Sequence, residues 1–236
     1  MSNAQLGSME DQTAVILLAD IAASSRLWGW SRIVRGPGAL RKISGLRFAK
    51  VLGSGFDGGF DLRPSRSRQG VFAVFESLQK AQDFLAQSKL VLEYQNRSDE
   101  FCSITLKAWS CRGTWDGMGL QVNAEHPAHG PVAALTRASI KFSKAPAFWR
   151  HAPSSQTALE GVEGCQLAVG LGEAPFFRQA TFTIWSGVKE MNAYARTGAH
   201  LAAIQAATQN AYFSESMFAR FVPLKVQGTW MGKHYA

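Results

Sequence analysis

The sequence predicts an α+β protein in which one βαββαβ module occurs twice, with the two copies closed into a single barrel. Three observations predict this fold. Similar segments recur in the same order along the chain, both halves show the same succession of strand and helix patterns, and the apolar content suffices for a large core. The chain has 236 residues, 46% of them hydrophobic and 18% charged, which excludes disordered and fibrous classes.

Three pairs of segments define the repeat. RGTW at 112–115 returns as QGTW at 227–230, FAVFES at 72–77 as FTIWSG at 182–187, and VLGSG at 51–55 as VGLGE at 169–173. The separations differ by only a few residues, which is typical of a duplicated unit. We therefore divide the chain into a first repeat at 13–115, a second repeat at 131–232 and a Gly-rich connector at 116–130.

The first repeat begins with an apolar run that is too short to span a bilayer and predicts a buried strand at 14–19. A helix follows at 25–34, because Leu27, Trp30 and Val34 recur at helical spacing. The rest of this copy is predicted to form strands at 48–52 and 71–75, a helix at 78–94 and a strand at 101–109.

The second repeat has the same order. An apolar run predicts a strand at 131–141, and a helix is expected at 144–151. Strands follow at 165–170 and 179–185, the latter alternating in period two and rich in Thr and aromatic residues. Helices at 187–196 and 199–212, separated by Gly198, and a closing strand at 218–230 complete the copy.

This order is the split βαβ or ferredoxin-like arrangement, a four-stranded antiparallel sheet with helices on one face. The other face of each sheet needs a cover, and the second copy can provide it for the first. The sequence therefore predicts two tandem ferredoxin-like repeats that form an intramolecular pseudo-dimeric α/β barrel. Residues 1–12 show no periodicity and are left out of this prediction.

Composition restricts the functional classes. The three cysteines, Cys102, Cys111 and Cys165, form no C-x-x-C pair, so neither a disulfide framework nor a structural zinc site is indicated. We expect a reducing, cytoplasmic compartment. No nucleophile-elbow or P-loop motif is present, so hydrolase and nucleotide-binding chemistry have no support.

One histidine distinguishes the second copy. His200 begins a stripe with Ala203, Ile204 and Ala207 at positions i, i+3, i+4 and i+7 of a helix, whereas the aligned positions of the first copy carry Leu90, Glu93, Tyr94 and Arg97. The small residues would allow close helix packing, with His200 in a local hydrogen bond. They would equally leave room for a flat group, and a histidine nitrogen is the usual proximal ligand of haem iron.

The chain also resembles a known family. LTRASI, VGLGEAP, FTIWSGVKEMNAYARTGAH and FARF followed by GTW, together with FAKVLGSG and RGTW, are similar to the spheroidene monooxygenases, which oxygenate acyclic carotenoids. The resemblance implies haem b, consumption of O2, and formation of a keto group at C2 of spheroidene or a related carotenoid. YARTGAH is also similar to dimeric α/β-barrel haem proteins, including aldoxime dehydratases, which implies that His200 ligates the iron.

Further site residues are candidates. Arg137 is a charge in an apolar strand that either faces solvent or serves catalysis, as a polar group near bound oxygen or the partner of a haem propionate; Glu173 is a candidate anionic partner. Trp185 is expected to line the cofactor pocket with Ala203, Ile204 and Ala207. The aromatic residues Phe176, Phe177 and Phe182 either line an apolar substrate pocket or belong to the core.

The positive charge is uneven. The formal net charge is +8, and ten of the Lys and Arg residues lie between residues 20 and 70, where there are only three Asp. Basic residues around Trp30 suit a peripheral contact with an anionic inner membrane, or form a solvated face over an ordinary core helix. Nucleic acid is not expected as a partner, because no reader motif is present.

The sequence thus predicts a haem-dependent monooxygenase with an apolar, carotenoid substrate. An external electron donor such as ferredoxin is needed, because the chain has no flavin or iron–sulfur motif. Two alternatives stay open. One is an aldoxime-dehydratase-like haem enzyme that consumes no oxygen, and the other is a haem or hydrophobic-ligand carrier without turnover.

Overall fold

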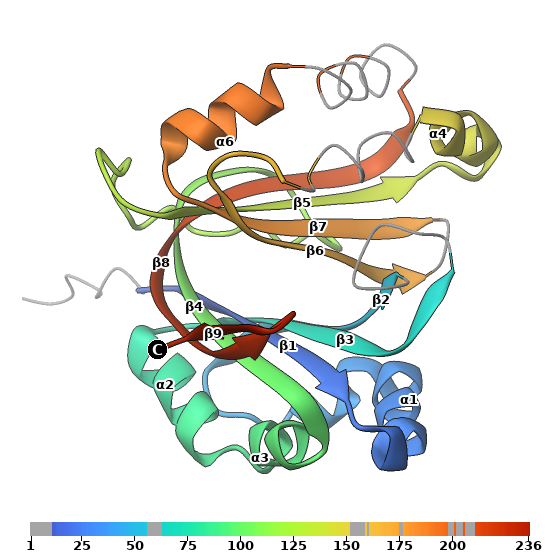
Figure 1. Cartoon of the computed structure of the whole chain (residues 1–236), viewed down its shortest axis with the longest axis vertical. Helices are drawn as coiled ribbons and strands as arrows, with labels where there is room; N and C mark the ends of the chain where they lie inside the picture. Colours follow the sequence, from blue (N-terminus) through green and yellow to red (C-terminus); the bar gives the residue numbers. More distant parts are fainter. Residues whose placement is uncertain are drawn as a thin grey trace, which may run out of the picture.

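The fold is that of a computed structural model, which describes residues 11–55, 63–151, 159, 161–174, 177–197, 201, 205 and 211–236. Two α+β halves pack sheet against sheet, and their helices lie on the two outer sides (Figure 1). The first half lies below in this view and the second above, while β4 and β8 run between them. The architecture confirms the predicted α/β barrel.

The elements follow the predicted order in both copies. The first copy comprises β1 (Thr13–Ile21), a 3-10 turn η1 (Ala23–Ser25), α1 (Arg26–Arg35), η2 (Gly36–Leu40), β2 (Leu46–Gly55), β3 (Pro64–Phe75), α2 (Leu78–Gln87), α3 (Lys89–Asn96) and β4 (Ser98–Gly113). The second comprises β5 (Val132–Ile140), η4 (Phe142–Lys144), α4 (Ala145–His151), β6 (Cys165–Ala174), β7 (Arg178–Trp185), α6 (Val188–Ala195), β8 (Phe213–Trp230) and the short β9 (Lys233–Tyr235).

Several details differ from the sequence prediction, and the longest extension is that of β3, which begins seven residues before the predicted 71. The helix expected at 78–94 is two helices, because Ser88 breaks the first and caps the second by accepting a hydrogen bond from the Leu90 amide at 3.3 Å. Strand β8 begins five residues earlier than the predicted 218, and β9 was not predicted. The helix expected at 199–212 lies almost entirely outside the described residues.

Two seams between the repeats close the barrel. Among the described residues the strand order is β4-β1-β3-β2-β6-β7-β5-β8-β9, and β4 also pairs with β8. The β2–β6 seam is short, with Gly53 opposite Gly172 and Ser54 opposite Leu171. The β4–β8 seam is long, running from Cys102 opposite Gly228 to Gly113 opposite Met217. Most of the hydrogen bonding between the repeats therefore lies along β4 and β8.

Strand alternation divides the apolar side chains into three cores. The barrel interior is filled from both repeats, with Ile16, Phe72, Ile104, Val169 and Phe221 among its fully buried members. A second core lies between the outer face of the first sheet and helices α1 to α3, and a third lies beneath α6 on the outer face of the second sheet. Each sheet therefore has one face in the shared interior and one face under its own helices.

The repeated Gly-Thr-Trp segment ends each long strand. Gly113 and Gly228 have positive φ values of 80° and 114°, and a Cβ would lie 2.0 Å from Ser216 O and 2.1 Å from Phe101 O, respectively. The tryptophans that follow, Trp115 and Trp230, are buried in the barrel interior. Glycine is required here because the backbone of the facing strand approaches too closely for any side chain.

A matching turn follows each Gly-Thr-Trp segment. Asp116 and Gly117 have φ values of 49° and 77°, and Met231 and Gly232 have φ values of 52° and 74°. Two consecutive left-handed residues are typical of the type I′ turn of a hairpin. Each turn donates backbone amides to a glutamate, Gly117 to Glu215 and Met231 and Gly232 to Glu100. The two repeats thus end in the same local structure.

This close approach gives a test of the fold. We expect Gly113→Ala and Gly228→Ala each to lower the free energy of unfolding by more than about 3 kcal/mol, since the new Cβ would push two strands apart. Gly117→Ala is the matched control: φ is also positive, yet nothing lies within 4 Å of its Cβ, so only about 1–2 kcal/mol of backbone strain is added. Urea unfolding measures all three; equal losses would contradict the assigned role of the seam.

Candidate functional site

The outer face of the second sheet is the best candidate for a ligand site, because the other faces carry large side chains. The barrel interior is packed with aromatic and aliphatic residues. Phe182, a candidate for the substrate pocket, belongs to this interior, and Phe177 stacks on Phe142 at 4.2 Å. The outer face of the first sheet is filled by its second core under α1 to α3.

Strand registers align the two outer faces residue by residue. In the first sheet Leu17 pairs with Val71, which pairs with Val51 on the other side. These three side chains are 1%, 2% and 8% exposed and form the middle row of that core. The same row of the second sheet consists, from β5 through β7 to β6, of Thr136, Thr181 and Gly170.

The neighbouring row is small in both sheets. Val15, Ala73 and Ala49 of the first sheet correspond to Ala134, Thr183 and Ala168 of the second, of which Ala134 and Ala168 pack against the third core. We call these two rows of the second sheet the small-residue face; its members are Ala134, Thr136, Ala168, Gly170, Thr181 and Thr183. Small side chains on a sheet face leave space between that face and the helices above it.

The same registers correct one of the sequence alignments. VLGSG and VGLGE align Gly53 with Leu171, whereas the structure places Gly53 opposite Gln69 and Gly172 opposite the equivalent Gln179. Gly53 therefore corresponds to Gly172, one residue further along. The repeat itself is unaffected, because the FAVFES and FTIWSG segments align Phe75 with Trp185 as the structure does.

Trp185 lies at the edge of the small-residue face and is buried. It packs against Tyr194 of α6 with ring centroids 5.2 Å apart, and its Nε1 donates to Thr183 Oγ1 at 2.9 Å. Trp185 lies on the helix side of β7, as α6 does. The sequence analysis predicts the cofactor ligand on the helix that follows α6 in the chain. Contact between Trp185 and a cofactor stays a prediction.

The residues predicted on the following helix cannot be placed. His200, Ala203, Ile204 and Ala207 lie outside the described residues. The described chain ends at Thr197, just beyond α6, and resumes fully at Ala211, just before β8. Since α6 covers the outer side of the second sheet, the chain leaves and re-enters the described structure on that side (Figure 1).

Positive charge borders the small-residue face. Arg220 on β8 pairs with Ala134, and its guanidinium lies 5.5 Å from the centre of the Trp109 ring. Arg112 is its diagonal neighbour on β4. Burial first, and then the like charges of Arg112 and Arg196, lower the pKa of Arg220. These three arginines make no ion pair within the described part of the chain, so they suit an anionic ligand.

A second polar feature lies inside one end of the barrel. Arg137 is 1% exposed and alternates with Thr136 and Ala138, so its side chain enters the interior while theirs face the helices. Its Nη1 donates to Glu215 at 2.5 Å, and its Nη2 lies 3.5 Å from Glu173. The solvent-facing alternative for Arg137 is therefore wrong, and the predicted pairing with Glu173 is confirmed.

Four more groups complete this barrel-end charge cluster, which we define as Lys50, Asp116, Arg137, Glu173 and Glu215. Lys50 donates to Glu173 at 2.6 Å and also contacts Asp116. Burial lowers the pKa of Lys50, but its hydrogen bonds to these two carboxylates outweigh burial and the net pKa is raised. The cluster thus joins β2 of the first repeat to β5, β6 and β8 of the second. Arg137 therefore has a structural function, and its catalytic role stays a prediction.

The sequence did not predict three members of the cluster, Lys50, Asp116 and Glu215, and Glu215 makes the shortest contact with Arg137. Burial tends to raise the pKa of Glu215, but hydrogen bonds from the Gly117 amide, Thr114 and Arg137 lower it to about 2. Glu215 was missed because the strand was predicted to start at 218. The signal available was the period-two alternation of Glu215 with the inward-facing Met217 and Ala219.

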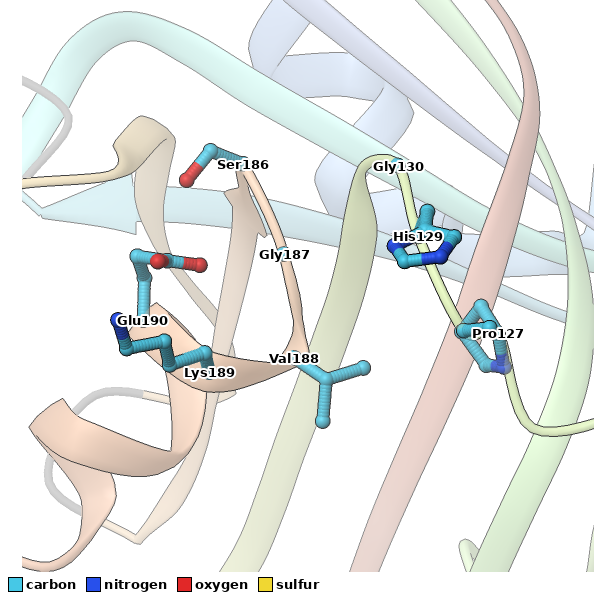
Figure 2. Close-up of a pocket in the computed structure, with 9 residues that line it drawn as sticks. Pro127, His129, Gly130, Ser186, Gly187, Val188, Lys189 and Glu190 are labelled. Atoms are coloured by element: carbon cyan, nitrogen blue, oxygen red, sulfur yellow. The ribbon is translucent and has the colours of Figure 1, made fainter.

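One small cavity lies elsewhere, between the connector and the start of α6. It has a volume of about 250 Å³. In Figure 2, Ser186, Lys189 and Glu190 lie on one side and Pro127 and His129 on the other. This cavity is smaller than typical cofactor pockets, which are several hundred Å³, so it is not a candidate haem site.

The described residues contain no cluster of three or more His, Cys, Asp or Glu that could hold a metal ion. His126, in the connector, stacks edge-on against Trp109 at 4.6 Å. Burial raises the pKa of the Cys102 thiol to about 12, so this cysteine stays protonated at neutral pH. No helix in the described portion of the chain is long and apolar enough to span a bilayer.

The depressed pKa of Glu215 makes stability depend on pH. The unfolded carboxyl has a pKa near 4.5 and the folded one about 2, so this group stabilises the fold above pH 4.5 and the contribution is lost as pH falls toward 2. We expect Glu215→Gln to be less stable than the parent at pH 7, with the difference shrinking toward pH 2. Thermal unfolding across this range measures it. Glu125→Gln, at an exposed connector position, is the control; a constant deficit for Glu215→Gln would refute the linkage.

Comparison with solved structures concerns the fold alone. An aldoxime dehydratase in complex with butyraldoxime superposes with a TM-score of 0.61 at 6% identity, covering 92% of this chain and 80% of the other. A second aldoxime dehydratase gives a TM-score of 0.59 at 8% identity, covering 93% and 84% of the two chains. The same barrel therefore occurs in proteins whose sequences have diverged almost completely from this one.

Curated sequences give a closer relationship, although no family model matches the chain. The chain is 52% identical to spheroidene monooxygenase from Rubrivivax gelatinosus, over 94% of this chain and 86% of that protein. It is 35% identical to the Rhodobacter capsulatus enzyme of the same name, over 89% of each chain, and 32% identical to that of Cereibacter sphaeroides. Identity at this level over nearly the full length shows that the chain belongs to the spheroidene monooxygenase family.

Proposed function

We propose that this protein is a haem-dependent monooxygenase that oxygenates an acyclic carotenoid, with the haem on the small-residue face of the second repeat. The reaction class and the substrate are supported by family membership, since the relatives are named for oxygenation of spheroidene. The position is supported by one observation: the row Leu17, Val71 and Val51 of the first sheet becomes Thr136, Thr181 and Gly170 in the second.

The residues on and around this face fit a haem. The face offers a flat, small-residue floor for the macrocycle. Arg220, Arg112 and Arg196 provide positive charge at its border for the two propionates. Trp109, beside Arg220, has a buried Nε1 without a hydrogen-bond partner among the described residues, so a polar ligand atom would satisfy it.

The opposite wall of this site would come from the helix predicted after α6. There His200 would ligate the iron, and Ala203, Ile204 and Ala207 would contact the macrocycle because they lie on the same helical stripe. Trp185 and the neighbouring Tyr194 would close one edge of the site against water. The haem b, when bound, supplies the iron chemistry with O2 that no amino-acid side chain can provide.

The chain's own contribution is positioning and exclusion of water. The methyl groups of Thr136, Thr181 and Ala134 make the floor largely apolar, as a polyene substrate requires. Arg137 lies on the other face of β5, with carboxylate partners, so any effect on catalysis would act through the position of Thr136 and Ala138. Arg137 is thus proposed as a positioning residue of this site.

The proposed reaction is oxidation of a methylene, C2 of spheroidene or a relative, to a ketone. Each hydroxylation places one oxygen atom of O2 on carbon and reduces the other to water, using two electrons and two protons. Two rounds on one carbon give a geminal diol, which loses water to form the ketone. The electrons would come from an external donor such as ferredoxin, since the chain has no flavin or iron–sulfur motif.

The aldoxime dehydratase fold supports a second candidate, a haem enzyme that acts on a nitrogenous substrate without consuming oxygen. A haem or hydrophobic-ligand carrier without turnover is a third. Oxygen consumption separates the first from the second, and product formation separates both from the third.

The haem site is tested by absorption spectroscopy. Protein loaded with haem should show a Soret band that shifts with carbon monoxide after reduction, and His200→Ala should lose the band, with added imidazole restoring it. His126→Ala is the control, because that ring is engaged by Trp109. An unchanged band in His200→Ala would refute the assignment of the ligand.

The small-residue face is tested by filling it. Replacing Thr136 with Leu and Thr181 with Val copies Leu17 and Val71 of the first sheet, and should weaken haem binding at least about tenfold, or 1.4 kcal/mol. Thr105→Val, on the outer face of the first sheet, makes a comparable change away from the site. Full haem affinity in the filled variant, with unfolding unchanged, would place the cofactor elsewhere.

Turnover tests the reaction. With a ferredoxin, its reductase and spheroidene, the loaded protein should form a product that is heavier by one carbonyl oxygen and lighter by two hydrogens, and ¹⁸O2 should label it. Mass spectrometry of the extracted carotenoid measures this. Product formation without O2, or none with O2 and a reduced haem, would exclude the proposed activity.

A further inference from the structure

Helix α1 has an exposed apolar stripe that the packing of the protein does not explain. Leu27, Trp30 and Val34 are 89%, 42% and 84% exposed and lie at positions i, i+3 and i+7. The core-facing side of the same helix is separate: Trp28 packs edge-on against Tyr94 at 4.9 Å, and Ile33 contacts the second core. Helix α1 therefore covers the second core with one side and leaves this apolar stripe exposed on another.

Basic residues lie at both ends of α1 and shortly after it in the chain. Arg26 and Arg35 lie at the two ends of α1, and Arg41 and Lys42 follow η2; all four are exposed. None of them makes an ion pair within the part of the chain that the structure describes. We call these four residues together with Leu27, Trp30 and Val34 the α1 surface.

Helix α1 lies at the outer edge of the first repeat, on the opposite side of the molecule from α6 (Figure 1). The other large exposed apolar residues are scattered: Leu92 on α3 and Leu224 on β8 are about half exposed, and Phe142, which is 80% exposed, stacks on Phe177. Among the described helices, α1 is the one in which large exposed apolar residues recur along one side.

We propose that the α1 surface docks on the surface of an anionic lipid bilayer. A helix with apolar residues on one side and basic residues at its borders lies in the plane of the interface, with its apolar side chains inserted into the acyl boundary. Tryptophan prefers this depth, and each Arg or Lys near an anionic surface strengthens binding. Two aliphatic side chains that project almost fully into solvent fit insertion into lipid better than contact with a hydrophilic protein.

This inference does not rest on the proposed haem site, since α1 belongs to the first repeat and the small-residue face to the second. Binding of the α1 surface to a bilayer would bring the protein to the lipid phase, in which an apolar polyene dissolves. Failure of one proposal therefore leaves the other standing, and the experiments use different readouts.

Flotation with lipid vesicles tests the proposal on the full chain. We expect the protein to float with phosphatidylcholine vesicles that contain roughly 30% phosphatidylglycerol, and less with phosphatidylcholine alone. Raising the salt from about 0.1 M to about 1 M shortens the Debye length from about 10 Å to about 3 Å and should weaken binding. No binding to the anionic vesicles at low salt would overturn the proposal.

Two variants separate the contributions. Leu27→Ser/Trp30→Ser/Val34→Ser should weaken vesicle binding at least about tenfold, and Arg26→Gln/Arg35→Gln/Arg41→Gln/Lys42→Gln should remove its dependence on phosphatidylglycerol. Leu92→Ser/Val122→Ser/Leu224→Ser is the matched control, because these apolar residues are exposed elsewhere. Thermal unfolding confirms that each variant is folded.

Equal binding of the serine variant and the parent would overturn the proposal. A second result would also overturn it. If the α1 variants bound vesicles normally but lost binding to an acidic protein such as a ferredoxin, the α1 surface would be a protein interface.

Discussion

The antiparallel pairing of β4 with β8 is the constraint on which the rest of the structure depends. These strands belong to different repeats, and their long seam closes the barrel. Gly113 and Gly228 allow the backbones to approach where each strand bends, and Trp115 and Trp230 then enter the interior. Closure buries one face of each sheet completely, so only the outer faces, under the helices, are left for ligands.

Duplication makes the two outer faces directly comparable. In the first repeat the face has large aliphatic residues and its helices pack on them, so this copy contributes stability. In the second repeat the same registers hold Thr, Ala and Gly, and the arginines at the border make no ion pair with the described residues. One copy thus has large aliphatic residues in the middle row, and the other has the small residues on which the proposed haem site is based. The barrel-end charge cluster, with Lys50 from the first repeat and Arg137, Glu173 and Glu215 from the second, links the copies across the shared interior.

Much of the fold was predictable because its signals are local. The Gly-Thr-Trp segments recur because both strand ends need the same glycine and the same buried ring, and the pairing of Arg137 with Glu173 follows from the cost of burying a lone charge. Contacts that depend on register were not predictable. Glu215 and Lys50 reach Arg137 only through strand pairings between distant segments, and helix α1 carries apolar residues on two sides, so its sequence alone does not say that Trp28 faces the core and Trp30 solvent.

The most direct test of the central claim is the position of the iron in crystals of haem-loaded protein, found by anomalous diffraction at the iron edge. We expect one iron per chain, on the helix side of the second sheet, above Thr136, Thr181 and Gly170. An iron above the first sheet, inside the barrel or between chains would contradict it, as would crystals of haem-treated protein that contain no ordered iron.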